Sequence, residues 1–457
     1  MQITNPKNGE LVGEIPDDTE SSVAAAYARA RRAQPDWAKT PLATRLAVIA
    51  RFRDLVAERK EQLAQTLTRE MGKPLSQAKN ELSALAGRID FFLANTAQVL
   101  ADESVLHEAD GSLDEVIAHE PLGVIANVSA WNYPWFVGSN VFVPALLTGN
   151  AVLYKPSEFT SLTGRHIAEL LHEAGVPADV FIPLYGGGAV GQALVDQPVD
   201  GVYFTGSYAT GRRIAERVAP RLIRFQLELG GKDPTYVAGD IDVKAAAESL
   251  ADGAMYNTGQ SCCSVERIYV EKGIEAPFLD AFVNTVKGFV VGDPEDDKTY
   301  IGPLAREAQL TVLEAQVADA VAKGARVLTG GKRIVGPGNY FEPTVIAGAT
   351  NEMRLMREES FGPIIGIAAV ADDEEAVTRM NDTEYGLTAG VYTRDPARAE
   401  RILSRVDAGS VYVNACDRVS PRLPWTGRRH SGIGSTLSSY GIRAFLQPKA
   451  WHKKRAG

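Results

Sequence analysis

The sequence predicts an α/β protein with two doubly wound domains that follow one another along the chain. Two observations lead to this prediction. Short apolar runs alternate with amphipathic segments between residues 124 and 218, and a second alternating set follows residue 235. Such alternation is typical of parallel sheets that are covered by helices on both faces.

The individual elements follow from the same periodicity. A helix is expected from Thr40, as N-cap, and Pro41 to an end at Gly72. The first set contains strands at 124–128, 151–154, 180–185 and 202–204, and helices near 160–174, 188–197 and 208–218. The second set contains strands at 234–239, 267–272, 325–330, 389–394 and 410–415, and helices near 243–256, 275–290, 304–322, 373–381 and 395–405.

Composition excludes several classes of protein. The chain has 457 residues, enough for about three domains, and its net charge of −9 argues against nucleic acid or an anionic membrane as partner. Residues 121–154 carry no charge, but four asparagines and two inner prolines indicate a buried interior instead of a membrane span. Three cysteines and no signal peptide predict a reducing, cytoplasmic location. The six histidines are scattered along the chain, so we expect no metal site. The sequence also lacks a G-x-S-x-G motif, which argues against a serine hydrolase.

Three loops are candidates for a nucleotide site. GGGAVG at 186–191 satisfies G-x-G-x-x-G, but it lies deep in the α/β region, so a tight turn beside a ligand or helix is the better interpretation. In FTGSYATG at 204–211, Ser207 can cap a helix whose first N–H groups would face a pyrophosphate; an ordinary strand-to-helix turn fits equally well. KPSE at 155–158 suits ribose hydroxyls, although a solvated ion pair would look the same.

Two adjacent cysteines, Cys262 and Cys263, are the candidate nucleophiles. A thiolate needs stabilisation, and the turn at Gly259 would hold backbone N–H groups near the sulfur. Cys263 is followed by VERIYVEK at 265–272, a strand pattern in which neighbouring side chains point in opposite directions, so we expect only one of the two cysteines to face a shared cavity. Two small buried residues without chemistry are the alternative.

Ten motifs in one order make the chain resemble the NAD(P)-dependent aldehyde dehydrogenase superfamily over almost its whole length. They are TREMGKP (68–74), PLGVIANVSAWNYP (121–134), LYKPSE (153–158), FTGS (204–207), FQLELGGKDP (225–234), NTGQSCCSVER (257–267), EESFGP (358–363), NDTEYGLTAGVYT (381–393), GSVYVN (409–414) and PWTGRRHSGIG (424–434).

The resemblance implies a role for three catalytic residues. Cys262 matches the family nucleophile, which would form a thiohemiacetal and then a thioester, and Cys263 matches a variable neighbour. Asn132 and the backbone N–H of Cys262 would stabilise the oxyanion, at about 3–4 kcal/mol per donor. Glu228 matches the base that activates water for thioester hydrolysis, and relatives that transfer the acyl group to coenzyme A generally lack this glutamate.

The resemblance also implies a cofactor site and an aldehyde tunnel. NAD is favoured by the carboxylate of Glu158, although relatives with this glutamate also accept NADP. The implied cofactor residues are Trp131, Lys155, Glu158, Gly187, Thr205, Gly206, Ser207, Glu359 and Phe361. The implied tunnel residues are Tyr133, Phe136, Val137, Tyr256, Val419 and Trp425. Arg418 and Arg422 flank the tunnel and would either pair with a distal carboxylate or face solvent or a subunit interface.

The family's architecture implies an aldehyde dehydrogenase-like fold with a small β arm for oligomerisation. Residues 1–100 and 122–230 would form the cofactor-binding domain and 231–430 the catalytic domain. Residues 101–121 and 442–457 would form the arm and a C-terminal strand, giving a homodimer or homotetramer. The chain departs from the family pattern at Ala130, in PWTGRR, and at Ser435-Thr436-Leu437-Ser438, where Arg-Glu-Leu-Gly is frequent; the missing acid at Thr436 removes a potential proton relay.

The expected activity is oxidation of an aldehyde to its carboxylic acid with NAD(P). Aromatic and aliphatic tunnel residues suit an apolar aldehyde of medium size. Three alternatives stay open: a dehydrogenase for a carboxylate-bearing aldehyde such as succinate semialdehyde, an acylating dehydrogenase linked to coenzyme A or phosphate, and an inactive binding or structural homologue. No partner besides the aldehyde, the cofactor and further copies of the chain is expected.

Overall fold

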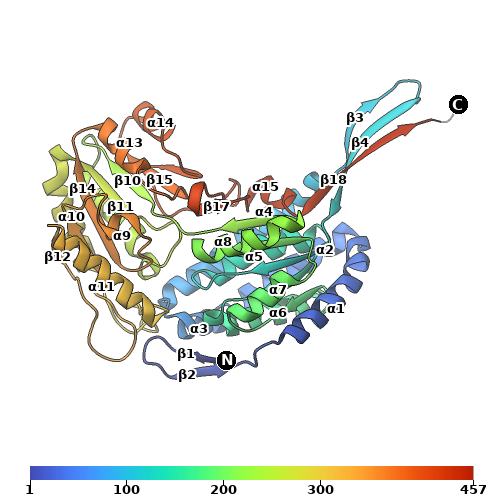
Figure 1. The fold of residues 1–457 in the computed structure, drawn as a ribbon, viewed down its shortest axis with the longest axis horizontal. Helices are drawn as coiled ribbons and strands as arrows, with labels where there is room; N and C mark the ends of the chain where they lie inside the picture. The colour runs from blue at the N-terminus through green and yellow to red at the C-terminus, as the bar shows by residue number, and fades with distance from the viewer. Residues whose placement is uncertain (456–457) are drawn as a thin grey trace.

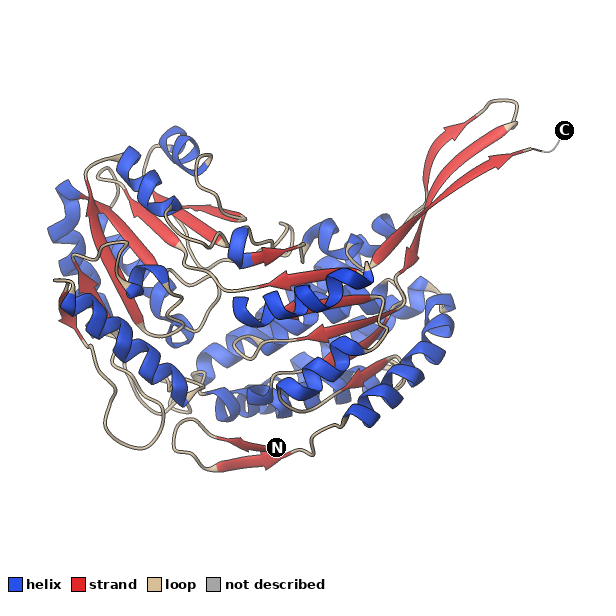
Figure 2. Ribbon diagram, in the orientation of Figure 1, coloured by secondary structure: helices blue, strands red, loops and turns tan. Residues whose placement is uncertain are grey.

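Two largely parallel β-sheets covered by helices form the two lobes of the computed structural model, which describes residues 1–455 (Figure 1). The first sheet has six strands in the order β17-β9-β8-β5-β6-β7. Its strands are β5 (Val124–Val128), β6 (Ala151–Lys155), β7 (Phe181–Pro183), β8 (Gly201–Thr205), β9 (Arg224–Glu228) and β17 (Gly432–Ile433). Figure 2 shows both sheets with helices packed around them, which confirms the predicted fold class.

The order of the first sheet reverses at β5. The chain runs outward from β5 through β6 to β7, and then returns to the other side of β5 for β8 and β9. The carboxyl ends of β5, β6 and β8 therefore meet at a topological switch point, where α/β proteins hold their ligands. The helices of this lobe are α1 (Glu20–Lys39), α2 (Leu42–Glu58), α3 (Lys60–Met71), α4 (Leu75–Leu100), α5 (Pro134–Leu147), α6 (Ser161–Ala174), α7 (Gly188–Asp196) and α8 (Tyr208–Val218).

The second sheet has seven strands in the order β12-β13-β14-β11-β10-β15-β16. Its strands are β10 (Pro234–Val237), β11 (Arg267–Glu271), β12 (Arg326–Thr329), β13 (Thr344–Ala347), β14 (Ile364–Val370), β15 (Thr388–Tyr392) and β16 (Ser410–Val413). Tyr236 and Tyr269 pack into one core and Val237 and Val270 into another, because successive side chains point to opposite faces. The main covering helices are α9 (Val243–Met255), α10 (Glu275–Lys287), α11 (Glu307–Ala322), α13 (Asp373–Asn381) and α14 (Pro396–Leu403).

Two strands of the second sheet were not predicted from the sequence. β13 is short, and β14 is an unbroken apolar run without the alternation that marks a half-buried strand. The sheet is also not entirely parallel, because β12 pairs antiparallel with β13 at its edge.

The prediction of one helix from Thr40 to Gly72 was wrong. The helix is interrupted at Arg59, which separates α2 from α3. Thr40 ends α1 and donates its hydroxyl to the Asp36 carbonyl at 3.1 Å, so Pro41 occupies the N-cap position of α2 without a side-chain cap. The predicted end at Gly72 is confirmed: its φ is 81°, in the left-handed region that glycine adopts readily.

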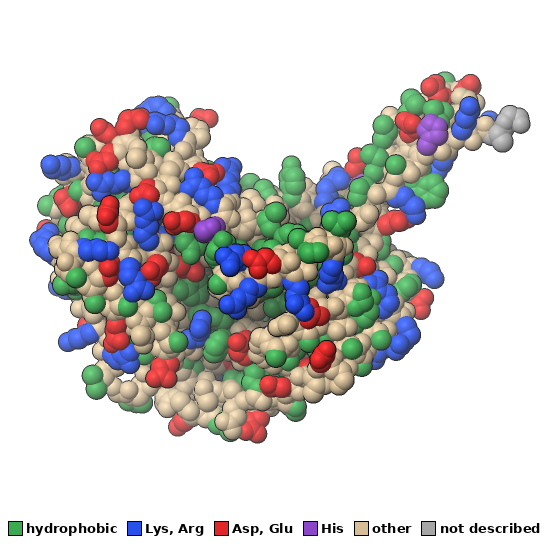
Figure 3. Space-filling model, in the orientation of Figure 1, with side chains coloured by type: hydrophobic (Ala, Val, Ile, Leu, Met, Phe, Trp, Pro, Cys, Tyr) green, Lys and Arg blue, Asp and Glu red, His purple; other side chains and the backbone are tan. Residues whose placement is uncertain are grey.

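The uncharged segment 121–154 is interior. It forms β5, α5 and β6, and nearly all of α5 is buried. Among residues 1–455, none of the helices combines the length and the apolar character needed to cross a membrane. Charged side chains of both signs are interspersed over the face drawn in Figure 3.

A three-stranded sheet projects from the first lobe (Figure 1). Its strands are β3 (Glu103–His107), β4 (Leu113–Pro121) and β18 (Leu446–Lys454), and β18 pairs antiparallel with the full length of β4. The C-terminal strand starts at Leu446, after the short helix α15 (Ser438–Arg443). The last two residues of the expected segment 442–457 lie outside the described part of the chain.

Candidate active site

The turn that carries the two cysteines joins α9 to β11 and is strongly bent. Asn257 and Thr258 have φ values of 54° and 59°, and Gly259 has 70°. A Cβ at Gly259 would lie 2.2 Å from the Gly362 carbonyl oxygen, so only glycine permits this close packing. The Thr258 hydroxyl donates a hydrogen bond to the Gly302 carbonyl and accepts one from the Gly302 N–H. These bonds connect the turn to the loop between α10 and α11.

Both cysteines border the same cavity, contrary to the prediction that only one would. The physical reason is that Cys262 and Cys263 lie in the turn, before the strand begins at Arg267, so strand alternation does not apply. Cys262 is half-buried, whereas Cys263 is buried and donates its thiol to the Asp417 carboxylate at 2.9 Å. The neighbouring Cys262 thiol, burial and Asp417 together raise the pKa of the Cys263 thiol well above its usual value. Cys263 is therefore held as a thiol.

Asn132 lies in the loop between β5 and α5 and is fixed on two sides. Its side-chain amide donates to the Gln260 carbonyl at 3.2 Å, two residues before Cys262. Its backbone carbonyl accepts from Lys73 Nζ at 2.7 Å and from the Asn257 amide at 3.2 Å. Lys73 is itself buried and paired with Glu81. These contacts bring the Asn132 amide next to the cysteine turn.

Glu228, the last residue of β9, is 7% exposed and borders the cavity of the cysteines. Its Oε1 accepts hydrogen bonds from the Thr436 hydroxyl and from the Gln226 amide at 3.1 Å. Burial raises the pKa of Glu228 to about 7, against the lowering effects of Thr436, Arg88 and Gln226. A carboxylate with this pKa is divided between its acid and base forms near neutral pH, which suits general base catalysis.

The cavity that contains Cys262 and Glu228 has a volume of about 650 Å³. Its wall includes the six residues expected in the aldehyde tunnel, which are Tyr133, Phe136, Val137, Tyr256, Val419 and Trp425, and also the two flanking arginines, Arg418 and Arg422. Arg418 and Arg422 are exposed to solvent. The wall also includes Arg88, which the sequence analysis did not identify.

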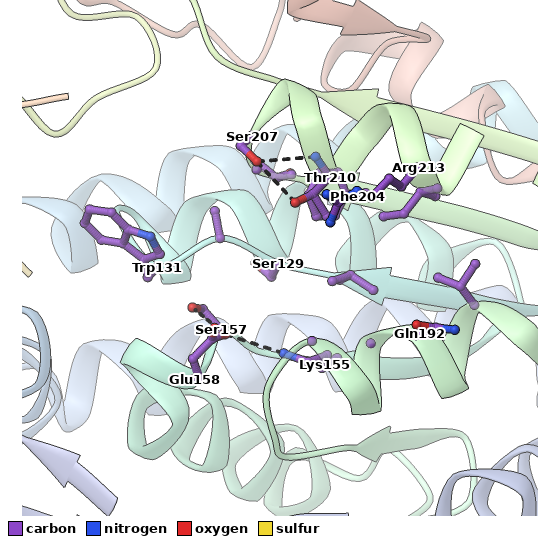
Figure 4. Close-up of a pocket in the computed structure, with 18 of the residues that line it drawn as sticks. Ser129, Trp131, Lys155, Ser157, Glu158, Gln192, Phe204, Ser207, Thr210 and Arg213 are labelled. Atoms are coloured by element: carbon purple, nitrogen blue, oxygen red, sulfur yellow. Dashed lines mark hydrogen bonds and ion pairs between the residues drawn. The ribbon is translucent and has the colours of Figure 1, made fainter. Parts of the chain in front are cut away.

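A second cavity of about 860 Å³ opens at the switch point of the first sheet. Six of the predicted cofactor residues line it: Trp131, Lys155, Glu158, Thr205, Gly206 and Ser207. Figure 4 shows Ser207 and Thr210 across the cavity from Lys155 and Glu158. The Ser207 side chain accepts from the Thr210 N–H at 3.4 Å and caps α8, as predicted.

The other three predicted cofactor residues, Gly187, Glu359 and Phe361, are not among the residues that line this cavity. Gly187 precedes α7, and its neighbour Gly188 is the residue in the wall. The Phe361 ring meets the Trp131 indole edge-on with 5.5 Å between ring centroids. The Glu359 carboxylate accepts from the Gly231 N–H at 3.0 Å, and burial raises its pKa to about 8.

The residues of the second cavity fit a dinucleotide. Gly206, Ser207 and Thr210 at the N-terminus of α8 line the cavity, and a helix N-terminus favours a bound pyrophosphate. The Lys155 ammonium lies 3.8 Å from the Glu158 carboxylate, so a donor and an acceptor for ribose hydroxyls stand together. A Cβ at Gly206 would lie 2.5 Å from the Phe204 ring, so the turn between β8 and α8 favours glycine at this position.

Comparison with known proteins agrees with this geometry. The sequence matches the profile of the aldehyde dehydrogenase family over residues 1–451. A Mycolicibacterium smegmatis protein named as an NADP(+) succinate-semialdehyde dehydrogenase is 38% identical over 445 residues, which are 96% of this chain and 86% of that protein. A betaine aldehyde dehydrogenase of Cereibacter sphaeroides is 36% identical over 452 residues, 98% of this chain and 93% of that protein.

Solved structures show the same fold. An NADP-dependent enzyme of E. coli superposes with a TM-score of 0.96 and 33% identity, covering 99% of this chain and 94% of that one. An indole-3-acetaldehyde dehydrogenase in complex with NAD+ gives the same score and identity, covering 100% and 93%. The fold and these relatives define an NAD(P)-dependent aldehyde dehydrogenase. The chain belongs to the aldehyde dehydrogenase family.

Proposed function

We propose that this enzyme oxidises its aldehyde through a covalent intermediate on Cys262 and releases a free carboxylic acid. The observation that carries the proposal is that Cys262 and the buried Glu228 border one cavity. The Cys262 thiolate attacks the aldehyde carbon to form a thiohemiacetal, and the Asn132 amide and the Cys262 N–H donate to its oxyanion. Loss of a hydride from that carbon converts the thiohemiacetal into a thioester.

Glu228 then completes the reaction as general base. It accepts a proton from a water molecule, the water oxygen adds to the thioester carbon, and the C–S bond breaks to return the Cys262 thiolate. Glu228 releases the proton to solvent, so the products are the carboxylic acid and the free enzyme. A pKa of about 7 supports this role, because Glu228 can then accept a proton near neutral pH. Hydrolysis is favoured over acyl transfer to coenzyme A, since relatives that transfer the acyl group to coenzyme A generally lack this glutamate.

The second cavity is the proposed cofactor site. Ser207, Gly206 and Thr205 would lie under the pyrophosphate, and Lys155 and Glu158 would hold the adenosine ribose. Glu359, beside Phe361 and Trp131, would bind the nicotinamide ribose. The nicotinamide cofactor, when bound, supplies the oxidising power as acceptor of the hydride. We expect a preference for NAD, because the Glu158 carboxylate can bond a 2′-hydroxyl and repels a 2′-phosphate.

Purified enzyme should form NADH with hexanal, benzaldehyde or succinate semialdehyde and one equivalent of acid. The rate with NAD should exceed the rate with NADP at equal concentrations. The measurement is absorbance at about 340 nm together with titration of the acid. Absence of turnover with every aldehyde and both cofactors would contradict the proposed function, and a requirement for coenzyme A or phosphate would support the acylating alternative.

Replacing Thr436 by valine should shift the pH dependence of acid release. The Thr436 hydroxyl stabilises the charged form of Glu228, so its loss raises the pKa of Glu228 further above its usual range. The rise of the hydrolysis rate with pH should then move upward by about one pH unit. Thr436→Ser keeps the hydroxyl and is the matched control. An identical pH profile in the valine variant would show that this hydrogen bond does not tune the base.

We also propose the domain division, oligomerisation and location expected from the family. The cofactor-binding domain comprises residues 1–100 and 122–230, the catalytic domain 231–430, and the arm 101–121 with the C-terminal segment. The arm leaves Val105, Leu106 and Trp451 exposed, which favours contact with a second copy of the chain. Light scattering should therefore give the mass of a dimer or tetramer, and a monomer would count against this. Three free cysteines support a reducing location such as the cytoplasm.

A further inference from the structure

Arg88 is a buried cation in the wall of the cavity that contains Cys262. It lies on α4, a helix that packs against α5, and its side chain is enclosed so that the residue is only 8% exposed. Both Cys262 and Glu228 border the same cavity. Arginine is rarely buried unless it is paired, so its partners decide what it does here.

The guanidinium is held in place by two neutral contacts. Its Nη1 donates to the Asn140 side-chain oxygen at 3.1 Å, and its central carbon lies 3.9 Å from the centroid of the Phe136 ring. Phe136 stacks in parallel on Tyr133, whose other neighbour is the Lys73 ammonium at 3.7 Å from the ring. This column fixes the plane of the Arg88 guanidinium before any ligand arrives.

One edge of that guanidinium has no partner. Within residues 1–455, Arg88 forms no ion pair, and neither Nε nor Nη2 donates a hydrogen bond. Both atoms retain some exposed surface. Because Arg88 belongs to the cavity wall, this edge can be reached from the cavity. Nε and Nη2 present two parallel N–H groups, which is the arrangement that binds both oxygens of a carboxylate.

The acidic residues of the cavity do not take this role, because each has donors of its own. Glu81 is paired with Lys73, and Asp252 accepts from the Tyr300 hydroxyl. Asp417 accepts from Cys263 and from Ser261 at 3.1 Å. Glu228 accepts from Thr436 and Gln226.

A buried cation without an anion is costly for the fold. Burial lowers the pKa of Arg88 to about 10, and at that value the group still carries its charge at neutral pH. A leucine or methionine would fill the same space without the desolvation penalty. The charge acts at a distance on Glu228, whose pKa it lowers, but this leaves the Nε–Nη2 edge without an acceptor.

We propose that the free Nε–Nη2 edge of Arg88 binds a carboxylate at the far end of the aldehyde substrate, so that the enzyme prefers aldehydes that carry an acid group. This inference rests on the proposed function, because the aldehyde carbon must reach Cys262 in the same cavity. It differs from the sequence analysis, which considered Arg418 and Arg422 for this role and left open that they face solvent or a subunit interface. Those two arginines are exposed at the cavity wall, where solvent weakens an ion pair.

The test compares each ω-carboxy aldehyde of three to six carbons with its methyl ester. For the wild-type enzyme, kcat/KM should be higher for the acid than for the ester. In Arg88→Met, this ratio should fall by roughly 100-fold, mainly through KM, because a buried bidentate contact to a charged group is lost. Arg88→Lys should retain part of the preference, since an ammonium keeps the charge but not the two parallel donors. Arg418→Met and Arg422→Met are the matched comparisons and should lower the ratio by about fivefold or less.

A second measurement does not depend on a variant that folds. Glutarate should inhibit the wild-type enzyme competitively against the aldehyde, and dimethyl glutarate should not. Equal kcat/KM for acids and esters at every chain length, an unchanged ratio in folded Arg88→Met, or equal inhibition by diacid and diester would each overturn the inference. Turnover of esters as fast as acids would leave the proposed function intact, whereas no turnover of any aldehyde would contradict the proposed function itself.

Discussion

Replacing Cys262 by alanine should abolish aldehyde oxidation, with kcat lowered by at least about 10⁴-fold. Without the sulfur, no thiohemiacetal forms, and neither the hydride-loss step nor the thioester step has a substrate. Half-burial in the bent turn keeps Cys262 accessible from the tunnel cavity. The measurement is NADH formation at saturating aldehyde and cofactor. Cofactor binding, followed by fluorescence quenching, should be unchanged and shows that the variant is folded.

Cys263→Ala is the matched control for this experiment. Cys263 is a neighbour of similar size in the same cavity, but its thiol is bonded to Asp417 and its pKa is raised. We expect its removal to lower kcat by no more than about tenfold, as a packing change near the site. Substantial activity in Cys262→Ala, or complete loss in Cys263→Ala alone, would exchange the roles of the two cysteines or reject the covalent mechanism.

Replacing Glu228 by glutamine should separate the two halves of the reaction. The amide retains the size of the side chain but cannot accept the proton of the attacking water, so thioester hydrolysis should slow by about 10²- to 10⁴-fold. Formation of the thioester does not need this base. Stopped-flow absorbance should therefore show a rapid burst of NADH close to one equivalent per active site, followed by a very slow steady state. Mass spectrometry of the quenched protein should find the acyl group on Cys262.

The pH dependence gives an independent check on Glu228. Because its pKa is raised to about 7, the wild-type hydrolysis rate should increase as the pH rises through 7, when the base form becomes populated. This increase should be absent from Glu228→Gln. Asp417→Asn removes another carboxylate of the same cavity and should keep both the steady-state rate, within about tenfold, and the pH dependence. A glutamine variant with wild-type steady-state turnover would exclude Glu228 as the base.

The sequence determined the order of elements and the segments that build the site. Strands β5, β6 and β8 and helices α6, α7 and α8 were predicted because apolar runs and amphipathic periods are local properties of the chain. The segments of Cys262, Glu228 and Asn132 were recognised because each contains a short motif, although β9 itself was not predicted as a strand. Strands β13 and β14 were missed, since short or wholly apolar runs carry no periodicity that separates strand from helix.

The tertiary structure decided which distant side chains meet. Thr436 reaches Glu228 across 208 positions of sequence, Asp417 reaches Cys263 across 154, and Asn140 reaches Arg88 across 52. In the sequence, Thr436 was only a missing acid, and Arg88 was not singled out, because no element was predicted for the segment that forms α4. The burial of Arg88 and the pKa values of Glu228 and Cys263 depend on all the groups that pack around them. That packing joins elements from distant parts of the chain, which no local sequence pattern relates.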